Sequence, residues 1–210
     1  MNTAAQPSVA NPVSQFQRFS EEDVRALIAE FPLAWVSTPG GTIGLASQLP
    51  LVGEYDVAGR LVALIGHLPR ANPLADALAS QARATILFSG PSGYVSPEHA
   101  GRRDWAPTWN YAQAKVEADV EISADLTALS LDVLIDACEG GRANPWTVGE
   151  IAARYQGMAA AIIGFRATVT ALQGRFKLGQ DERPDTLRHI LATHPDPVLV
   201  RWMRRFNREA

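Results

Sequence analysis

The sequence predicts a mainly β protein, a small closed antiparallel barrel with peripheral helices and a helical C-terminus. Two long segments, 111–122 and 162–173, alternate apolar and polar residues with a period of two, which is typical of strands that bury one face. The shorter strand-like segments do not alternate regularly with helices, and this argues against a doubly wound parallel sheet. A meander of six or seven strands closed into a barrel fits this order best.

The composition is that of one globular domain. The chain has 210 residues, of which 47% are hydrophobic and 20% are charged. Its formal net charge of −3 argues against binding polyanions over the whole surface but allows a local basic patch. The single cysteine, Cys138, rules out an internal disulfide framework and a zinc site built from cysteines. Because Cys138 lies in an apolar helical stretch, we expect it to be a small core residue.

The N-terminal segment 1–14 consists of small and polar residues with two prolines, and it predicts a mobile tail. It has neither the positive start nor the continuous apolar stretch of a signal peptide. No window of the sequence reaches the roughly 20 apolar residues of a membrane span. We therefore expect a cytoplasmic protein that does not bind a membrane.

The barrel is expected over 15–180. Ser20, followed by three acidic residues, is a good N-cap for a helix that reaches Phe31 and is stopped by Pro32. Four short strands and one short helix are predicted next. The strands are Leu33–Ser37, Thr42–Leu51, Arg60–Leu68 and Ala84–Phe88, and the helix is Leu74–Ala79.

A helical insertion at about 124–157 separates the two long strands. It holds a helix over Leu126–Cys138, ended by two glycines, and a second helical stretch that Pro145 opens. The C-terminal segment, 181–210, predicts two more helices, Thr186–Ala192 and Pro197–Arg208. Asp196 is the expected N-cap of the last helix.

One predicted loop, 66–73, combines groups that can grip a ligand. Within six residues it offers the imidazole of His67, the guanidinium of Arg70 and the amide of Asn72. Arginine suits phosphate because its planar fork donates two parallel hydrogen bonds. The alternative is structural: Asn72 and Pro73 cap a helix, and His67 is a hydrogen-bonded residue at a strand end.

Three further segments offer complementary chemistry. The predicted loops 94–97 and 107–111 place aromatic rings beside a hydroxyl and an amide, which suits a planar ligand ring; packing at the barrel mouth is the alternative. The segment 173–180 ends the last long strand with two cations and two amides. It can hold a phosphate or be a solvated strand end.

Taken together, these segments resemble the PaiB-type negative transcriptional regulators of the FMN-binding split-barrel superfamily, over about residues 16–185. The matching segments are Gly66-His67, Arg70-Ala71-Asn72-Pro73, Tyr94-Val95-Ser96-Pro97, Pro107-Thr108-Trp109-Asn110-Tyr111, Asn144-Pro145-Trp146 and Lys177-Leu178-x-Gln180. The chain departs from the family pattern at Gln48, where the family usually has histidine, and at Gly179 and Asp181.

The resemblance implies an FMN-binding split β-barrel that forms a homodimer, with FMN sites at the dimer interface. It implies that FMN is lined by His67, Arg70, Asn72, Thr108, Trp109, Asn110, Lys177 and Gln180. No catalytic residue is expected. The alternatives are a flavin-dependent oxidoreductase that acts on a small molecule and a degenerate family member that binds another ligand.

The last predicted helix carries Arg201, Arg204, Arg205 and Arg208 at positions i, i+3, i+4 and i+7. Such a stripe can contact DNA phosphates, as a regulator would need. The alternative is a solvated face whose cations complement the helix dipole. The four histidines are scattered without paired ligand spacing, so no metal site is expected.

Overall fold

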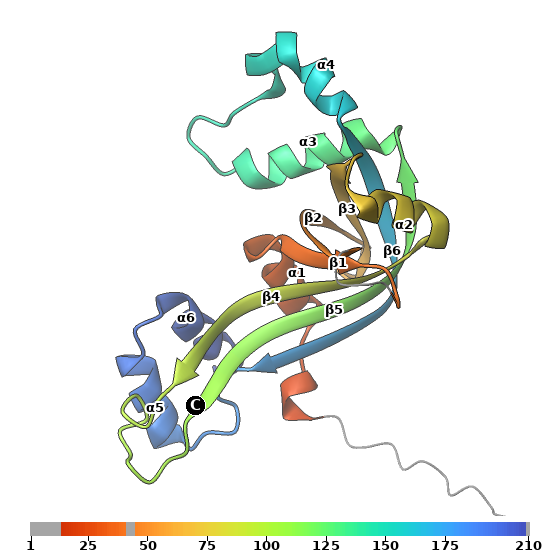
Figure 1. Ribbon diagram of the computed structural model, residues 1–210. Coiled ribbons are helices and arrows are strands. Elements are labelled where there is room, and N and C mark those ends of the chain that lie inside the picture. The colour runs from red at the N-terminus through yellow and green to blue at the C-terminus, as the bar shows by residue number, and fades with distance from the viewer. Residues whose placement is uncertain (1–13, 41–44, 209–210) are drawn as a thin grey trace, which may run out of the picture.

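The computed structural model describes residues 14–40 and 45–208. Within these residues, six antiparallel strands close into one barrel in the order β1-β2-β3-β6-β5-β4 (Figure 1). The strands are β1 Leu33–Ser37, β2 Ser47–Tyr55, β3 Leu61–Pro69, β4 Arg83–Val95, β5 Thr108–Ser123 and β6 Ile162–Lys177. The predicted antiparallel barrel is confirmed. The predicted tail up to residue 13, and the first residues of the strand predicted at Thr42–Leu51, lie outside the described residues.

Strands β4, β5 and β6 are 13, 16 and 16 residues long, and they run beyond the barrel as a long curved ribbon (Figure 1). β4 does not end at Phe88 as predicted. Its register shifts between Ser89 and Ser92, and it then pairs again until Val95 lies opposite Thr108. The bulge accommodates Gly90 and Pro91, a pair that in the sequence indicates the end of a strand. The prediction of loops at 94–97 and 107–111 is therefore wrong for 94–95 and 108–110, which are paired strand ends. Tyr111 lies in β5, as the predicted strand 111–122 requires.

The helices are η1 Gln15–Gln17, α1 Glu21–Glu30, α2 Pro73–Gln81, α3 Leu126–Glu139, η3 Val148–Ile151, α4 Ala152–Ala160, α5 Pro184–Thr193 and α6 Pro197–Phe206. Helices α1, α2 and α6 start at side-chain N-caps, whereas α3, α4 and α5 have no side-chain cap hydrogen bond. The Ser20 hydroxyl accepts a hydrogen bond from the Asp23 amide at 3.2 Å. The Asp196 carboxylate accepts one from the Val198 amide at 2.8 Å. Both predicted N-caps are thus confirmed.

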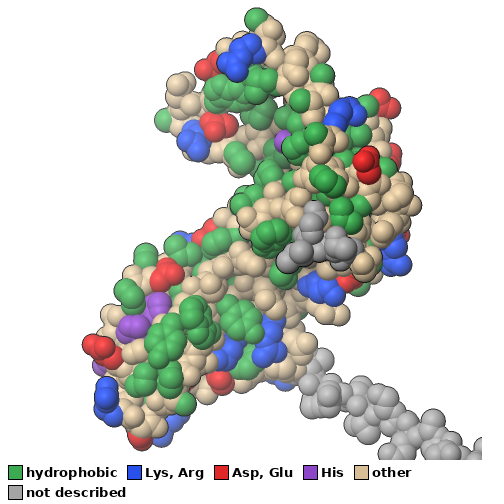
Figure 2. Space-filling model, in the orientation of Figure 1, with side chains coloured by type: hydrophobic (Ala, Val, Ile, Leu, Met, Phe, Trp, Pro, Cys, Tyr) green, Lys and Arg blue, Asp and Glu red, His purple; other side chains and the backbone are tan. Residues whose placement is uncertain are grey.

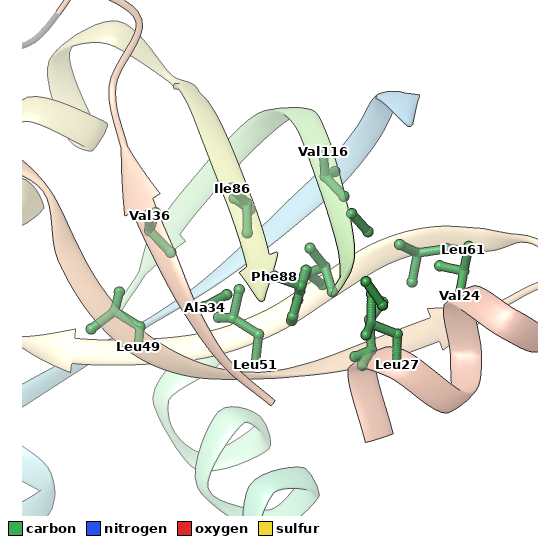
Figure 3. Close-up of a cluster of buried hydrophobic side chains, with 14 of the residues drawn as sticks. Val24, Leu27, Ala34, Val36, Leu49, Leu51, Leu61, Ile86, Phe88 and Val116 are labelled. Atoms are coloured by element: carbon green, nitrogen blue, oxygen red, sulfur yellow. The ribbon is translucent and has the colours of Figure 1, made fainter. Parts of the chain in front are cut away.

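Aliphatic side chains and Phe88 fill the barrel interior (Figure 3). Helix α1 packs against the barrel and contributes Val24 and Leu27, which are both fully buried. A Cβ atom on Gly90 of β4 would lie 2.4 Å from Cδ1 of Leu27, so glycine is needed for this close approach of helix and strand.

Helix α6 joins the outer part of the ribbon to α1. Its Trp202 is 2% exposed and stacks on Phe176 of β6, with ring centroids 6.3 Å apart. The Trp202 indole nitrogen also donates a hydrogen bond to the Glu30 carboxylate at 3.0 Å. Arg205 pairs with Asp23 of α1 at 2.6 Å. The C-terminal helix is therefore an integral part of the fold.

Helix α3 lies beside β3 and β6 at the other end of the molecule (Figure 1). The Thr127 hydroxyl accepts a hydrogen bond from the Gly164 amide at 3.1 Å, and the buried residues of α3 are Thr127, Ser130 and Leu134. Cys138 is exposed, so its prediction as a core residue is wrong. The last turn of α3 borders an open groove instead of packing on the sheet.

Candidate functional site

The first set of candidate side chains, His67, Arg70 and Asn72, lies where β3 ends and α2 begins; we call it the β3–α2 group. β3 sends Leu64 and Leu68 into the barrel core, so His67 points to the outer face of the barrel. His67 is half-buried, and its Nδ1 atom is buried without a hydrogen-bond partner within residues 14–40 and 45–208. This finding does not fit the alternative of a hydrogen-bonded strand-end histidine.

Burial lowers the pKa of His67 from its ordinary value of 6.5, because the charged imidazolium loses hydration. The side chain is therefore neutral at neutral pH, with one donor and one acceptor nitrogen.

Asn72 caps the start of α2, and Arg70 bonds to the end of α4. Asn72 Oδ1 accepts a hydrogen bond from the Leu74 amide at 3.0 Å, and its Nδ2 donates to Ser47 Oγ at 2.9 Å. The helix-capping alternative is thus confirmed for Asn72. Arg70 Nε donates to the Ala160 carbonyl at 3.1 Å. Its terminal amino groups have no hydrogen-bond partner among the described residues and remain free for an anion.

Two exposed apolar side chains of β1 share the outer face with His67. Leu33 is 50% exposed and Trp35 is 47% exposed, and the strand registers place Leu33, Pro50 and His67 in one row. The sequence analysis missed both residues, because the apolar run 33–37 does not identify its exposed face. The only feature of the sequence that points to this face is that the large residues Leu33 and Trp35 alternate with smaller neighbours.

The second set is Thr108, Trp109, Asn110, Lys177 and Gln180, at the start of β5 and the end of β6; we call it the β5–β6 group. Lys177 Nζ donates hydrogen bonds to Thr108 Oγ1 and to the Trp109 carbonyl. An ammonium group has three donors, so one remains for an anion. The structure thus brings these three residues together.

Trp109 presents an aromatic surface to solvent. Its side chain is 57% exposed and meets the Tyr94 ring edge to face, with ring centroids 6.0 Å apart. A shallow groove of about 350 Å³ runs from Trp109 along the bulge of β4. An exposed pair of this kind can stack on a planar ligand ring.

Asn110 and Gln180 bond within the protein. Asn110 is 2% exposed, and its Nδ2 contacts Met203 Sδ at 3.6 Å. Gln180 accepts a hydrogen bond from the Leu178 amide at 2.7 Å and donates one to the Phe176 carbonyl at 2.6 Å. These side chains shape the strand ends and support the exposed members of the group.

Glu182 lies close to the β5–β6 group. Its carboxylate accepts a hydrogen bond from the Trp105 indole at 3.0 Å. Burial raises the pKa of Glu182, and the neighbouring Asp181 acts in the same direction, whereas the Trp105 bond and Lys177 lower it. The sequence analysis did not single out this carboxyl, because its burial depends on a contact with a residue 77 positions away.

The two groups lie at opposite ends of strand β6 (Figure 1). His67 lies opposite Gly164, near the start of β6, whereas Lys177 ends the strand thirteen residues later. At about 3.3 Å per residue, roughly 40 Å of strand separates them. One copy of the chain therefore does not bring all eight candidate residues into one site.

The chemistry of the two groups fits a flavin mononucleotide. Arg70 and Lys177 each keep donors for a phosphate, and Trp35 and Trp109 expose aromatic faces. The half-buried imidazole of His67 adds a polar group to the outer face that carries Trp35. Charged donors and exposed aromatic surface are thus present at both groups, on an antiparallel barrel.

The chain belongs to the family described as "Putative FMN-binding domain", which matches residues 12–171. The "Protease synthase and sporulation protein PAI 2" of Bacillus subtilis (strain 168) is 22% identical over 178 residues, which cover 84% of each chain.

Solved structures show the same fold at low identity. The FAD and heme binding protein of Mycobacterium smegmatis matches with a TM-score of 0.55 and 21% identity, over 85% of this chain and 80% of that one. The flavocytochrome Anf3 of Azotobacter vinelandii matches with a TM-score of 0.52 and 17% identity, over 76% of this chain and 68% of that one. These likenesses confirm the split-barrel architecture.

Two further findings concern the described part of the chain alone. None of its helices is long and apolar enough to cross a membrane. None of its His, Cys, Asp and Glu side chains gather in threes or more as a metal site requires.

Proposed function

We propose that the protein binds FMN as a homodimer, in sites that combine the β3–α2 group of one copy with the β5–β6 group of the other. The observation that carries this proposal is the separation of two complementary groups within one copy. A two-fold axis places opposite ends of two copies side by side. Two equivalent sites then form, and each contains both groups.

In such a site, Arg70 and Lys177 hold the phosphate, because their free donors are charged. Thr108 keeps Lys177 in place through the hydrogen bond between them. Trp109 stacks on the isoalloxazine ring, and the neutral His67 bonds to its edge. Bound FMN supplies reversible electron uptake.

For the biological role we propose regulation of transcription in the cytoplasm. The resemblance of the ordered motifs to the PaiB-type regulators supports this role, and the sequence shows no dedicated acid–base pair that would favour an enzyme. The regulatory proposal therefore rests on family likeness, whereas the FMN proposal rests on side-chain chemistry.

We also propose that α6 contacts DNA, through fewer arginines than the four predicted from the sequence. Arg201 pairs with Glu30, and Arg205 pairs with Asp23, so α1 neutralises half of the predicted stripe. The structure ends α6 at Phe206, so Arg208 lies beyond the helix that was predicted to include it. Arg204 of α6 and the neighbouring Arg208 then make the phosphate contacts. We expect the double variant Arg204→Ala/Arg208→Ala to lower retention on duplex DNA and to reduce its salt dependence by about two counterions. Unchanged retention would contradict the DNA contact.

The FMN proposal predicts quenching of FMN fluorescence when the purified protein is added. Arg70→Ala and Lys177→Ala should each weaken binding about tenfold or more, because each removes a charge-assisted bond to the phosphate. Arg60→Ala is the matched control, since Arg60 is an exposed arginine paired with Asp56 in the loop before β3. Absence of quenching at high FMN concentration would rule out the cofactor.

A further inference from the structure

A groove of about 490 Å³ lies between α1, β2 and the last turns of α3. Figure 2 shows the surface hollowed between the lobe that carries α3 and the barrel. This volume is within the range of small-molecule pockets. The groove uses Leu51, Val52, Gly53 and Tyr55 of β2, and none of the eight candidate FMN residues is in its lining. It is therefore a different hollow from the two candidate FMN groups.

Apolar side chains from three elements form the walls of the groove. Ile28 comes from α1, Leu51 and Val52 come from β2, and Leu134 and Ala137 come from α3. Ile28, Leu51 and Leu134 are 2%, 1% and 6% exposed, so these walls are fixed parts of the fold. The accessible apolar surface comes from Val52, which is half-buried, and from Ala137, which is exposed, and this surface can take up the apolar body of a ligand.

The charged residues of the groove are predominantly cationic. Arg25 lies over the Tyr55 ring, with its guanidinium carbon 4.1 Å from the ring centroid. No carboxylate of the described residues lies within ion-pair distance of Arg25. Stacking holds the guanidinium in place without neutralising it.

The other charged residues in the lining do not cancel the positive charge of Arg25. Arg142 lies at the α3 side and pairs with Glu139 at 3.3 Å. Glu30 is the one carboxylate of the described lining. It is already bound by Arg201 and by the Trp202 indole of α6. A negatively charged ligand therefore finds an unpaired arginine at Arg25.

We propose that this groove binds a small amphipathic organic anion, such as an aryl or medium-chain carboxylate. Its apolar body lies between β2 and α3, and its carboxylate binds Arg25. Guanidinium and carboxylate match in geometry and charge, and the apolar walls contribute affinity in proportion to the area they bury. The proposal does not depend on FMN binding.

Cys138 gives a specific readout, because it lines the groove and is the single cysteine of the chain. The rate at which iodoacetamide alkylates Cys138 is measured in the full-length protein with increasing 1-naphthoate. We expect 1-naphthoate to protect Cys138, and the neutral analogue 1-naphthylmethanol to protect it much less.

Variants of Arg25 distinguish the contribution of its positive charge from that of its guanidinium shape. Arg25→Gln should raise the half-protecting concentration of 1-naphthoate about tenfold or more, and Arg25→Lys should raise it less. Arg60→Gln is the control outside the groove. If Arg25→Gln does not fold, Arg142→Gln provides a second test, because removing this exposed cation should also weaken protection.

Three results would overturn the proposal. Equal protection of Cys138 by 1-naphthoate and 1-naphthylmethanol would show that the ligand's charge does not contribute to binding. Unchanged protection by 1-naphthoate in both arginine variants would show that the arginines do not bind its carboxylate. A Cys138 that does not react even without naphthoate would show that a second copy of the chain covers the groove. Loss of FMN binding with intact naphthoate protection would overturn the proposed function alone.

Discussion

His67 has a buried ring nitrogen without a hydrogen-bond partner among the described residues, beside an exposed apolar face. Such an atom costs stability, because it has lost hydrogen bonds to water without replacing them. Asn72 and Gln180 show the opposite arrangement, since their amide groups are already bonded within the protein.

The lowered pKa of His67 predicts a pH-dependent stability. Because burial lowers the pKa of His67 in the folded protein, the unfolded chain binds its proton more readily. Stability should fall as pH decreases below the ordinary value of 6.5, and this loss should level off below the lowered pKa. Urea unfolding of the ligand-free protein between about pH 5 and about pH 8 measures the effect.

His67→Gln should make this pH profile flatter, since glutamine does not titrate. His189→Gln is the matched control, because His189 is exposed on α5 and bonds to the carbonyl of His99. An unchanged profile in His67→Gln would show that another group causes the pH dependence.

At the scale of elements, α6 is fixed to the rest of the molecule by both stacking and charge. Trp202 is nearly fully buried between Phe31, Phe176 and Phe206, so its removal should leave a large cavity. We predict that Trp202→Ala lowers the free energy of unfolding by about 3 to 5 kcal/mol.

Arg204→Ala is the control for this prediction, because Arg204 is an exposed residue on the same helix. It should change the free energy of unfolding by less than about 0.5 kcal/mol. Urea unfolding of both variants tests the difference. Equal stability of the two would mean that α6 is dispensable for the fold.

Local signals predicted the starts of elements well. Ser20 and Asp196 act through bonds to amides two or three residues away, and such contacts are visible in the sequence. The end of β4 was predicted too early, because the bulge at Gly90-Pro91 depends on pairing with β5. The exposure of Cys138 likewise depends on where α3 lies over the barrel.

At the scale of the whole molecule, the barrel lies between two projecting parts (Figure 1). One is the α3–α4 insertion, and the other is the ribbon end that carries α5 and α6. The candidate residues were recognised from motifs in the sequence, and the structure gathers them into two groups. Their separation along β6 could not be predicted, because it depends on the length and register of paired strands.

The central claim is that each FMN site takes one group from each of two copies. Mixing two defective chains, Arg70→Ala and the double variant Trp109→Ala/Lys177→Ala, tests it most directly. In a mixed dimer, one site joins the intact β3–α2 group of the second chain with the intact β5–β6 group of the first. The other site in that dimer contains both defects.

Each variant is first titrated with FMN alone, and the two are then mixed under conditions that exchange copies. With random exchange, about a quarter of the sites should regain tight FMN binding, although neither variant binds tightly by itself. No recovery in a mixture shown to contain mixed dimers would contradict a site shared between two copies.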